Sequence, residues 1–127
     1  FIHIHMETII LIAKIAISLT LLMVWLVRPK METSYRGGDA KNLKEEFAVY
    51  GLPGWFMITI GVLKVGFALM LVASIWVQEL TLISSAAIAL LMAGAVSMHI
   101  KVKDTLMKFL PSLSLLILSL FVLIFAA

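Results

Sequence analysis

Residues 54–77 read GWFMITIGVLKVGFALMLVASIWV and carry a single charged side chain, that of Lys64. After Gln78 and Glu79 comes a second apolar block, residues 80–100, which reads LTLISSAAIALLMAGAVSMHI. A helix needs about 20 mainly apolar residues to cross the hydrocarbon core of a bilayer. Both blocks have this length, and only a short polar turn separates them. They are therefore predicted to form an antiparallel pair of membrane-spanning helices.

Two further apolar blocks flank this pair, residues 8–27 and residues 110–127. Backbone polar groups in lipid must be satisfied within the structure, so each block is predicted to be a helix. The composition agrees, because 63% of the residues are hydrophobic and 13% are charged, against about 25% charged in soluble domains. The predicted fold class is all-α, an integral membrane four-helix bundle in a single membrane domain, residues 1–127.

The first block is expected to be a span rather than a signal peptide. Residues 6–25 lack both a preceding basic region and a small-x-small cleavage site. Met6 could be a natural start, with residues 1–5 an upstream extension or a remnant of processing.

The basic residues between the blocks predict an orientation. Four spans place residues 28–53 and 101–109 on one side, and both termini and the 78–79 turn on the other. Every lysine and arginine outside the spans lies on the first side: Arg28, Lys30, Arg36, Lys41, Lys44, Lys101, Lys103 and Lys108. Basic loops face the cytoplasm. We therefore expect a multi-pass protein of the cell inner (plasma) membrane with both termini on the outer, periplasmic side. Trp25, Trp55 and Trp76 fall at the predicted span boundaries, as aromatic belts do.

The long connection, residues 28–53, is predicted to contain a short interfacial helix over residues 39–50. Asp39 can cap its start, and Gly51 and Pro53 end it. Four apolar side chains recur at helical spacing: Ala40, Leu43, Phe47 and Tyr50. This pattern predicts an amphipathic helix that lies on the cytoplasmic interface or is tucked under the bundle.

Arg36, Gly37 and Gly38 precede this helix and read as a flexible turn. The two glycines could instead form a nest of backbone N–H groups that contacts an anion or a lipid headgroup.

Lys64 is the most informative single residue, because it lies near the middle of its span. A lysine at the bilayer centre costs roughly 2.5–3.5 kcal/mol on insertion scales, so it should face a protein interior, a cavity or a partner. Gly61 lies on the same face and allows a neighbouring helix to approach. Lys64 could bind an anionic or carbonyl-bearing amphiphile, pair with an acidic residue of another subunit, or be held by backbone carbonyls or kept neutral. No acidic residue lies within a span, so an intrachain carboxylate partner is expected only if Glu7 or Glu79 folds inward.

Three other polar residues have a structural and a functional interpretation. Lys14 could bind a ligand or partner, or extend to the outer interface beside Ser18. His99 could relay protons or hydrogen-bond a headgroup. Asp104 is expected to cap the fourth helix, with Pro111 delaying or bending its start.

No catalytic constellation is visible, neither a nucleophilic triad nor a nucleotide loop nor paired carboxylates. The chain has no cysteine, which excludes disulfides and CxxC chemistry. A metal site is not expected, because His3 and His5 lie on the other side of the predicted bundle from His99. The net charge of +3 follows a membrane pattern, so nucleic acid is not an expected partner.

Patterns in three parts of the chain match one known family. Residues 50–55 read YGLPGW and residues 60–65 read IGVLKV; residues 89–104 carry ALLMAGAV and then MHIKVKD; a leucine-rich helix follows Leu110 and Pro111. Together they resemble the DoxX-like family of small four-helix membrane proteins, over roughly residues 8–126. Many relatives carry an acidic residue where Lys64 stands, so any role of that carboxylate does not transfer.

Three functions follow as hypotheses. The first is a noncatalytic accessory subunit of a membrane complex or a binder of a lipid-like ligand, with membrane lipids, other membrane subunits or further copies of the chain as partners. The bulky helix over residues 110–127 and the unpaired Lys64 favour it. The second, implied by the resemblance, is the membrane subunit of a quinone-linked oxidoreductase with quinone as cofactor near Lys64 or His99. The third is a small oligomeric transporter, although the spans lack the broken helices and carboxylates of coupled transport.

Overall fold

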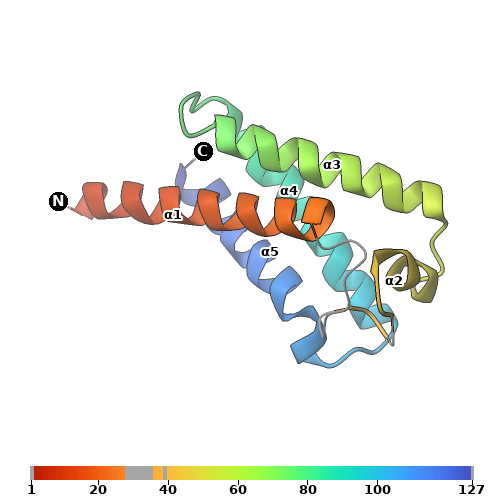
Figure 1. Ribbon diagram of the computed structural model, residues 1–127. Coiled ribbons are helices and arrows are strands. Elements are labelled where there is room, and N and C mark those ends of the chain that lie inside the picture. Colours follow the sequence, from red (N-terminus) through yellow and green to blue (C-terminus); the bar gives the residue numbers. More distant parts are fainter. Residues whose placement is uncertain (1, 28–35, 39, 127) are drawn as a thin grey trace.

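The computed structural model describes residues 2–27, 36–38 and 40–126, and these form helices joined by turns (Figure 1). The helices are α1 (Ile2–Leu22), a π-helical turn η1 (Met23–Val27), α2 (Leu43–Val49), α3 (Gly54–Ala73), α4 (Leu80–Lys101) and α5 (Leu106–Ala126). Four of them, α1 with η1, α3, α4 and α5, are long and apolar enough to cross a membrane. The predicted fold class, a four-helix membrane bundle, is confirmed.

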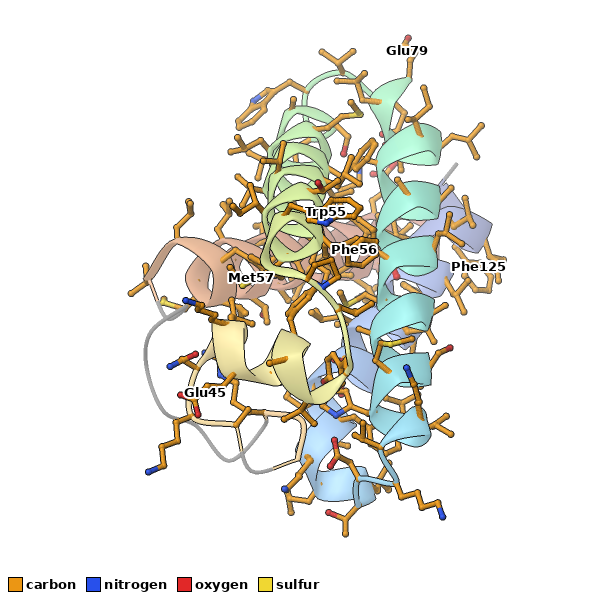
Figure 2. All side chains as sticks on the ribbon, turned by 90° about the vertical axis from the view of Figure 1, so that its right-hand side faces the viewer. Glu45, Trp55, Phe56, Met57, Glu79 and Phe125 are labelled. Carbon is orange, nitrogen blue, oxygen red and sulfur yellow. The ribbon has the colours of Figure 1, made fainter. Side chains whose placement is uncertain are left out.

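The helices alternate in direction, so each end of the bundle gathers the connections that the topology predicts. The first turn of α1, the last turn of α5 and the α3–α4 turn lie at one end, and α2 lies at the other (Figure 1). A hydrogen bond of 2.7 Å from the side-chain amide of Gln78 to the carbonyl of Ala126 joins two of these segments. Figure 2 shows Glu79 and Glu45 at opposite ends of the molecule.

The spans differ from their predicted bounds where local geometry intervenes. α1 begins six residues before the predicted residue 8, at Ile2. α3 ends at Ala73 rather than at residue 77, and the backbone N–H groups of Ile75 and Trp76 then bond the carbonyls three residues before them, in a turn. α5 begins at Leu106, with a non-helical Phe109 just before Pro111. Proline lacks an N–H and its ring crowds the preceding turn, which accounts for this break.

The short helix α2 covers residues 43–49, so it is shorter than the predicted helix over residues 39–50. Asp39, the predicted cap, lies outside the described residues. Asn42 caps the helix, because its side chain accepts a hydrogen bond of 2.9 Å from the backbone N–H of Glu45. α2 packs against α3 with Leu43 and Phe47 buried. Of the two predicted positions, it occupies the one tucked under the bundle.

The end of α4 is a left-handed turn at Lys103, whose φ is +59°. The N–H of Asp104 bonds the carbonyl of His99 at 3.0 Å, and the N–H of Lys103 bonds that of Ile100 at 3.0 Å. This is the Schellman pattern, normally closed by glycine. It turns the chain back so that Asp104 lies beside the last turn of α4.

The hydrophobic core lies between the four long helices. α5 packs along α4, and α1 lies against both α3 and α5. The core residues are fully or almost fully buried: Ala13, Ile17, Leu21, Ala68, Leu71, Ile88, Met92, Leu115 and Val122. Buried serines cost little here, since the hydroxyls of Ser84, Ser85 and Ser119 bond carbonyls of their own helices.

Candidate ligand-binding site

A cavity of about 420 Å³ lies inside the bundle at the end nearer to α2. Most of its wall is apolar, from residues such as Leu21, Phe47, Phe56, Ile60, Leu91 and Leu115. Polar residues also line it, among them the titratable residues Arg36, Glu46, Tyr50, Lys64 and His99. They come from the loop before α2, from α2 itself, and from α3 and α4. The folded chain therefore encloses an apolar chamber with a set of convergent polar groups.

His99 is the centre of a buried polar network. Its side chain is almost fully buried, and its Nδ1 lies 2.8 Å from the Asp104 carboxylate. Its Nε2 lies 3.2 Å from the hydroxyl of Tyr50. The imidazole also stacks on Phe109, with ring centroids 5.7 Å apart. Asp104 therefore does not act as the predicted cap of α5, because its two carboxylate oxygens face His99 and Gly38.

The tautomer of His99 decides the direction of these hydrogen bonds. If Nδ1–H donates to Asp104, Nε2 accepts from the hydroxyl of Tyr50. The Glu46 carboxylate interacts electrostatically with the same hydroxyl.

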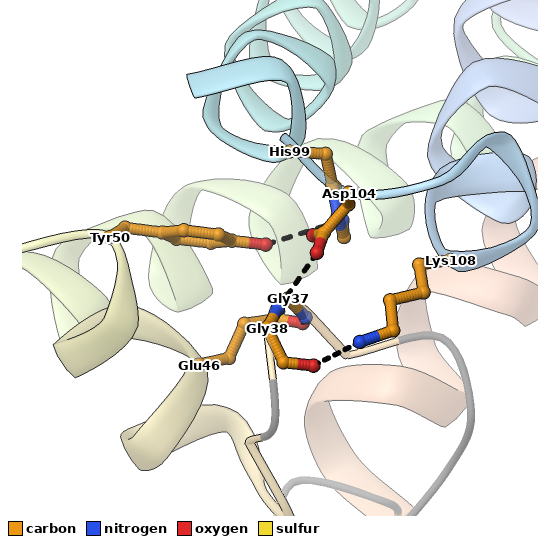
Figure 3. A network of polar contacts seen from close by, with 7 residues as sticks. All are labelled: Gly37, Gly38, Glu46, Tyr50, His99, Asp104 and Lys108. Carbon is orange, nitrogen blue, oxygen red and sulfur yellow. Dashed lines mark hydrogen bonds and ion pairs between the residues drawn. The ribbon is translucent and has the colours of Figure 1, made fainter. Parts of the chain in front are cut away.

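Gly37 and Gly38 hold two carboxylates of the protein itself (Figure 3). The N–H of Gly37 donates to Glu46 at 2.6 Å, and the N–H of Gly38 donates to Asp104 at 3.0 Å. Lys108 donates to the carbonyl of Gly38. The two N–H groups thus bind two different internal carboxylates, and the contact with an external anion or headgroup stays a prediction.

These positions require glycine. A β-carbon on Gly37 would lie 2.5 Å from the Tyr50 ring, and Gly38 has a φ of +55°, a conformation that side chains rarely adopt. Lys101 adds a hydrogen bond of 3.0 Å to the backbone carbonyl of Tyr50. The loop, α2 and the ends of α4 and α5 are thereby fastened to one another around the polar end of the cavity.

Burial changes the acid–base properties of the two α2 residues in this network. Burial raises the pKa of the Glu46 carboxyl above its ordinary value, against the opposing effects of the Gly37 N–H and the charges of His99, Arg36 and Lys64. Burial also raises the pKa of the Tyr50 hydroxyl, and the neighbouring carboxylates of Glu46 and Asp104 raise it further. Tyr50 thus remains a neutral hydrogen-bonding group.

Lys64 lines the cavity from the middle of α3 and is 8% exposed. Its ammonium lies 5.2 Å from the centroid of the Trp25 ring. Such a contact contributes about 2 kcal/mol when desolvated, which is less than the roughly 2.5–3.5 kcal/mol cost of a central lysine. Glu46 lies close enough for its charge to interact with Lys64. No ion pair joins Glu46 to Lys64 among the described residues, so the expectation about an intrachain carboxylate partner stays a prediction.

Gly61 sets the position of Trp25. A β-carbon there would lie 2.7 Å from Cε3 of the indole. Trp25 belongs to η1, and π-helical turns of this kind are frequent at functional sites. Gly61 thus acts through Trp25, which it allows to lie against Lys64.

Lys14 lies apart from this site, near the opposite end of the bundle. It is 4% exposed, and its ammonium donates to the carbonyl of Ser74 at 3.3 Å and to the hydroxyl of Thr81 at 3.0 Å. It therefore ties α1 to the C-terminal end of α3 and the first turn of α4. Ser18, one turn further along α1, is buried, and its hydroxyl has no partner among the described residues.

Besides Lys14, six residues are predicted from the sequence as site residues, and five of them lie in or beside the cavity. Lys64, His99 and Arg36 line the cavity, and Gly61 and Gly37 position residues that line it; Gly38 holds Asp104 in the adjoining network. Within the described residues, no three histidine, aspartate or glutamate side chains are grouped as a metal site would require.

Three residues of the site are not predicted as such from the sequence: Trp25, Glu46 and Tyr50. Trp25 is expected only as a boundary tryptophan. Glu46 lies three residues after Leu43 and four before Tyr50, so it shares the apolar face of α2, and that spacing is the signal that could have identified it.

A bundle of four apolar helices around an internal, polar-ended cavity defines a multi-pass membrane protein with a candidate site for an amphiphile. The model of the DoxX-like family matches residues 34–122, which include α2 to α4 and most of α5. The chain belongs to the DoxX-like family. No match was found among curated proteins or among solved structures.

Proposed function

We propose that this DoxX-like protein binds a lipid-like amphiphile inside its bundle, as a noncatalytic membrane protein. The observation that carries the proposal is the cavity of about 420 Å³ with apolar walls and convergent polar residues. An amphiphile has the same division into an apolar chain and a polar head. Small-molecule sites commonly have about 300–1,000 Å³, mainly apolar walls and a few polar groups that fix the orientation.

A second feature supports a ligand that comes from the membrane. An apolar groove on the outside of α3 is lined by Met57, Ile58, Val62 and Val65, and Trp25 and Leu43 line both the groove and the cavity. Ile58 and Val62 are 63% and 66% exposed, as suits contact with lipid. A bilayer amphiphile in the groove would therefore be separated from the cavity by a few side chains.

The test is to purify the protein in a mild detergent and to identify co-purifying amphiphiles by native mass spectrometry. Ala95 lines the cavity on α4, whereas Ala86 is exposed on the same helix. Ala95→Phe should remove the bound species, and Ala86→Phe should retain it. Ala95→Leu gives a smaller obstruction if the phenylalanine variant fails to fold. A wild-type protein without any bound amphiphile, in detergent and in nanodiscs, would contradict the proposal.

Docking to other membrane subunits or to further copies of the chain belongs to the same proposal. Ile117, Ile124 and Phe125 of α5 are 58%, 68% and 57% exposed and offer a bulky apolar face. Such a face suits lipid or a second membrane helix, since both are apolar. Crosslinking in the native membrane from position 124, followed by identification of the captured protein, would test this role.

The aromatic lining favours quinone as a second candidate ligand. Phe47 lies 6.0 Å from Trp25 and 6.5 Å from Phe56 between ring centroids, and all three rings line the cavity. Tyr50 and His99 could hydrogen-bond a carbonyl. This candidate would make the protein the membrane subunit of a quinone-linked oxidoreductase. Titration of the purified protein with a short-chain quinone, in the wild type and in Lys64→Met, would test it, and equal absence of binding in both would remove it.

A further inference from the structure

The ammonium of Lys64 lines the cavity without a hydrogen-bond acceptor among the described residues. The Lys64 residue is only 8% exposed, and its ammonium has three N–H donors. Its described contacts are the face of Trp25 at 5.2 Å and the charge of Glu46. Within the described part of the chain, no oxygen accepts a hydrogen bond from it. Lys14, the other lysine within a span, has two such acceptors.

Glu46 does not complete the coordination of Lys64, because its carboxylate is engaged elsewhere. It accepts a hydrogen bond of 2.6 Å from the N–H of Gly37. His99 likewise has Asp104 at 2.8 Å and Tyr50 at 3.2 Å. Glu46 and His99 therefore have hydrogen-bond partners within the protein, whereas Lys64 on α3 has none among the described residues.

Trp25 covers the ammonium from the side of the bilayer. The indole lines both the internal cavity and the outer groove along α3. Displacement of Trp25 and of Leu43, which also lines both spaces, would join them and expose Lys64. The anionic head of a ligand that enters in this way would take the place of the Trp25 ring beside the Lys64 ammonium and accept its hydrogen bonds. Charge-assisted hydrogen bonds are stronger than neutral ones.

On the basis of the proposed function, we infer that the ligand is a membrane amphiphile with an anionic head, a carboxylate or a phosphate monoester, whose oxygens bind Lys64. The chain of the ligand would occupy the apolar part of the cavity. Trp25 would act as the positioning residue that covers Lys64 in the absence of ligand. The preference for an anion distinguishes this inference from general binding of amphiphiles.

Tryptophan quenching can test this directly. The chain has three tryptophans, and Trp55→Phe with Trp76→Phe leaves Trp25 as the reporter in the site. The probes are a brominated fatty acid at pH 8 and its methyl ester, which differ only in the head. We expect the acid to quench Trp25 with an affinity at least about tenfold higher than the ester. Lys64→Met should remove this preference, and Lys64→Arg should retain it.

The controls separate the possible failures. Lys14→Met should keep the preference, because Lys14 lies outside the cavity. Equal quenching by acid and ester, lost in Ala95→Phe, would overturn the anionic head but support amphiphile binding. Absence of quenching by both would overturn the proposed function as well. Competition by acetate or inorganic phosphate at millimolar concentration would overturn the membrane origin of the ligand, and a brominated alkyl phosphate that binds like the acid would support the shared anionic chemistry.

Discussion

A β-carbon on Gly61 would lie 2.7 Å from Cε3 and 2.8 Å from Cζ3 of Trp25, so the indole rests directly on the glycine. We predict that Gly61→Ala displaces Trp25 from Lys64 and lowers the free energy of unfolding by about 1–3 kcal/mol, as overpacking does. The emission of Trp25 should shift when Trp55 and Trp76 are replaced by phenylalanine. Gly66→Ala, on the same helix with no atom within 4 Å of its β-carbon, is the matched control and should be neutral or stabilising. Equal effects of the two changes would contradict this account.

The pair of His99 and Asp104 should be energetically coupled, because both side chains are 4% exposed and 2.8 Å apart. We predict that His99→Gln and Asp104→Asn each destabilise the protein by about 1–3 kcal/mol, since each leaves a buried polar partner unsatisfied. A double-mutant cycle, measured by unfolding with SDS in mixed micelles, should give a coupling of about 0.5–3 kcal/mol. Additive effects of the two substitutions would show that the contact carries no stability of its own.

Glu46 should make the protein more stable in mild acid. Burial raises the pKa of its carboxyl above the ordinary value of 4.5, so the folded state binds a proton more tightly than the unfolded state. Stability then falls as the pH rises from about 4.5 through the higher folded pKa, and is recovered on acidification. The charges that face Glu46 are those of Arg36, Lys64 and His99.

The measurement is thermal unfolding between pH 4.5 and 8 for the wild type and Glu46→Gln. Glutamine keeps an acceptor for Gly37 but does not titrate, so the slope in this window should flatten. Glu45→Gln is the matched control, because Glu45 is the exposed neighbour on the same helix. A slope that is identical in the wild type and Glu46→Gln would contradict the prediction.

The turn at Lys103 stores backbone strain, because its φ of +59° is unfavourable for a residue with a β-carbon. We predict that Lys103→Gly raises the free energy of unfolding by about 1 kcal/mol, the usual left-handed cost. Lys103→Ala removes the same charge but keeps the β-carbon, so it should give no such gain. A stabilisation by alanine equal to that by glycine would assign the effect to charge rather than to the backbone.

The orientation remains a prediction that the cysteine-free sequence makes simple to test. Lys41 and Glu79 are exposed and lie on opposite sides of the predicted topology. In right-side-out vesicles, an impermeant maleimide should label Glu79→Cys and spare Lys41→Cys. Inside-out vesicles should give the reverse pattern, and labelling of Lys41→Cys in right-side-out vesicles would invert the topology.

The spans were predictable because membrane helices depend on local hydropathy. Four apolar blocks of sufficient length were enough to give the number and order of the helices and the short α3–α4 turn. Their ends were less accurate, since the cap at Ser74 and the break at Phe109 depend on backbone geometry that hydropathy does not report. The family resemblance was expected over roughly residues 8–126, and the family model matches 34–122.

The site was predictable only in part, because its residues are polar in ways that require tertiary contacts to interpret. Lys64 stood out through the cost of burying its charge. Glu46 was not predicted, because its burial depends on the packing of α2 against α3, which brings its carboxylate to the N–H of Gly37. Asp104 was expected as a helix cap, since nothing in the sequence indicates that Lys103 adopts the left-handed turn that directs it to His99. Lys14 could be interpreted only once Ser74 and Thr81 were seen beside it.

The fastening of Gly38 by both Asp104 and Lys108 has a consequence for biogenesis. During synthesis, Glu46 and the loop before α2 leave the ribosome long before the residues that hold them in place. The contacts of Gly38 with Asp104 and Lys108 can therefore form only after the start of α5 has been synthesised. A nascent chain halted before residue 104 would hold its first three spans but would lack Asp104 and Lys108, the two residues that contact Gly38.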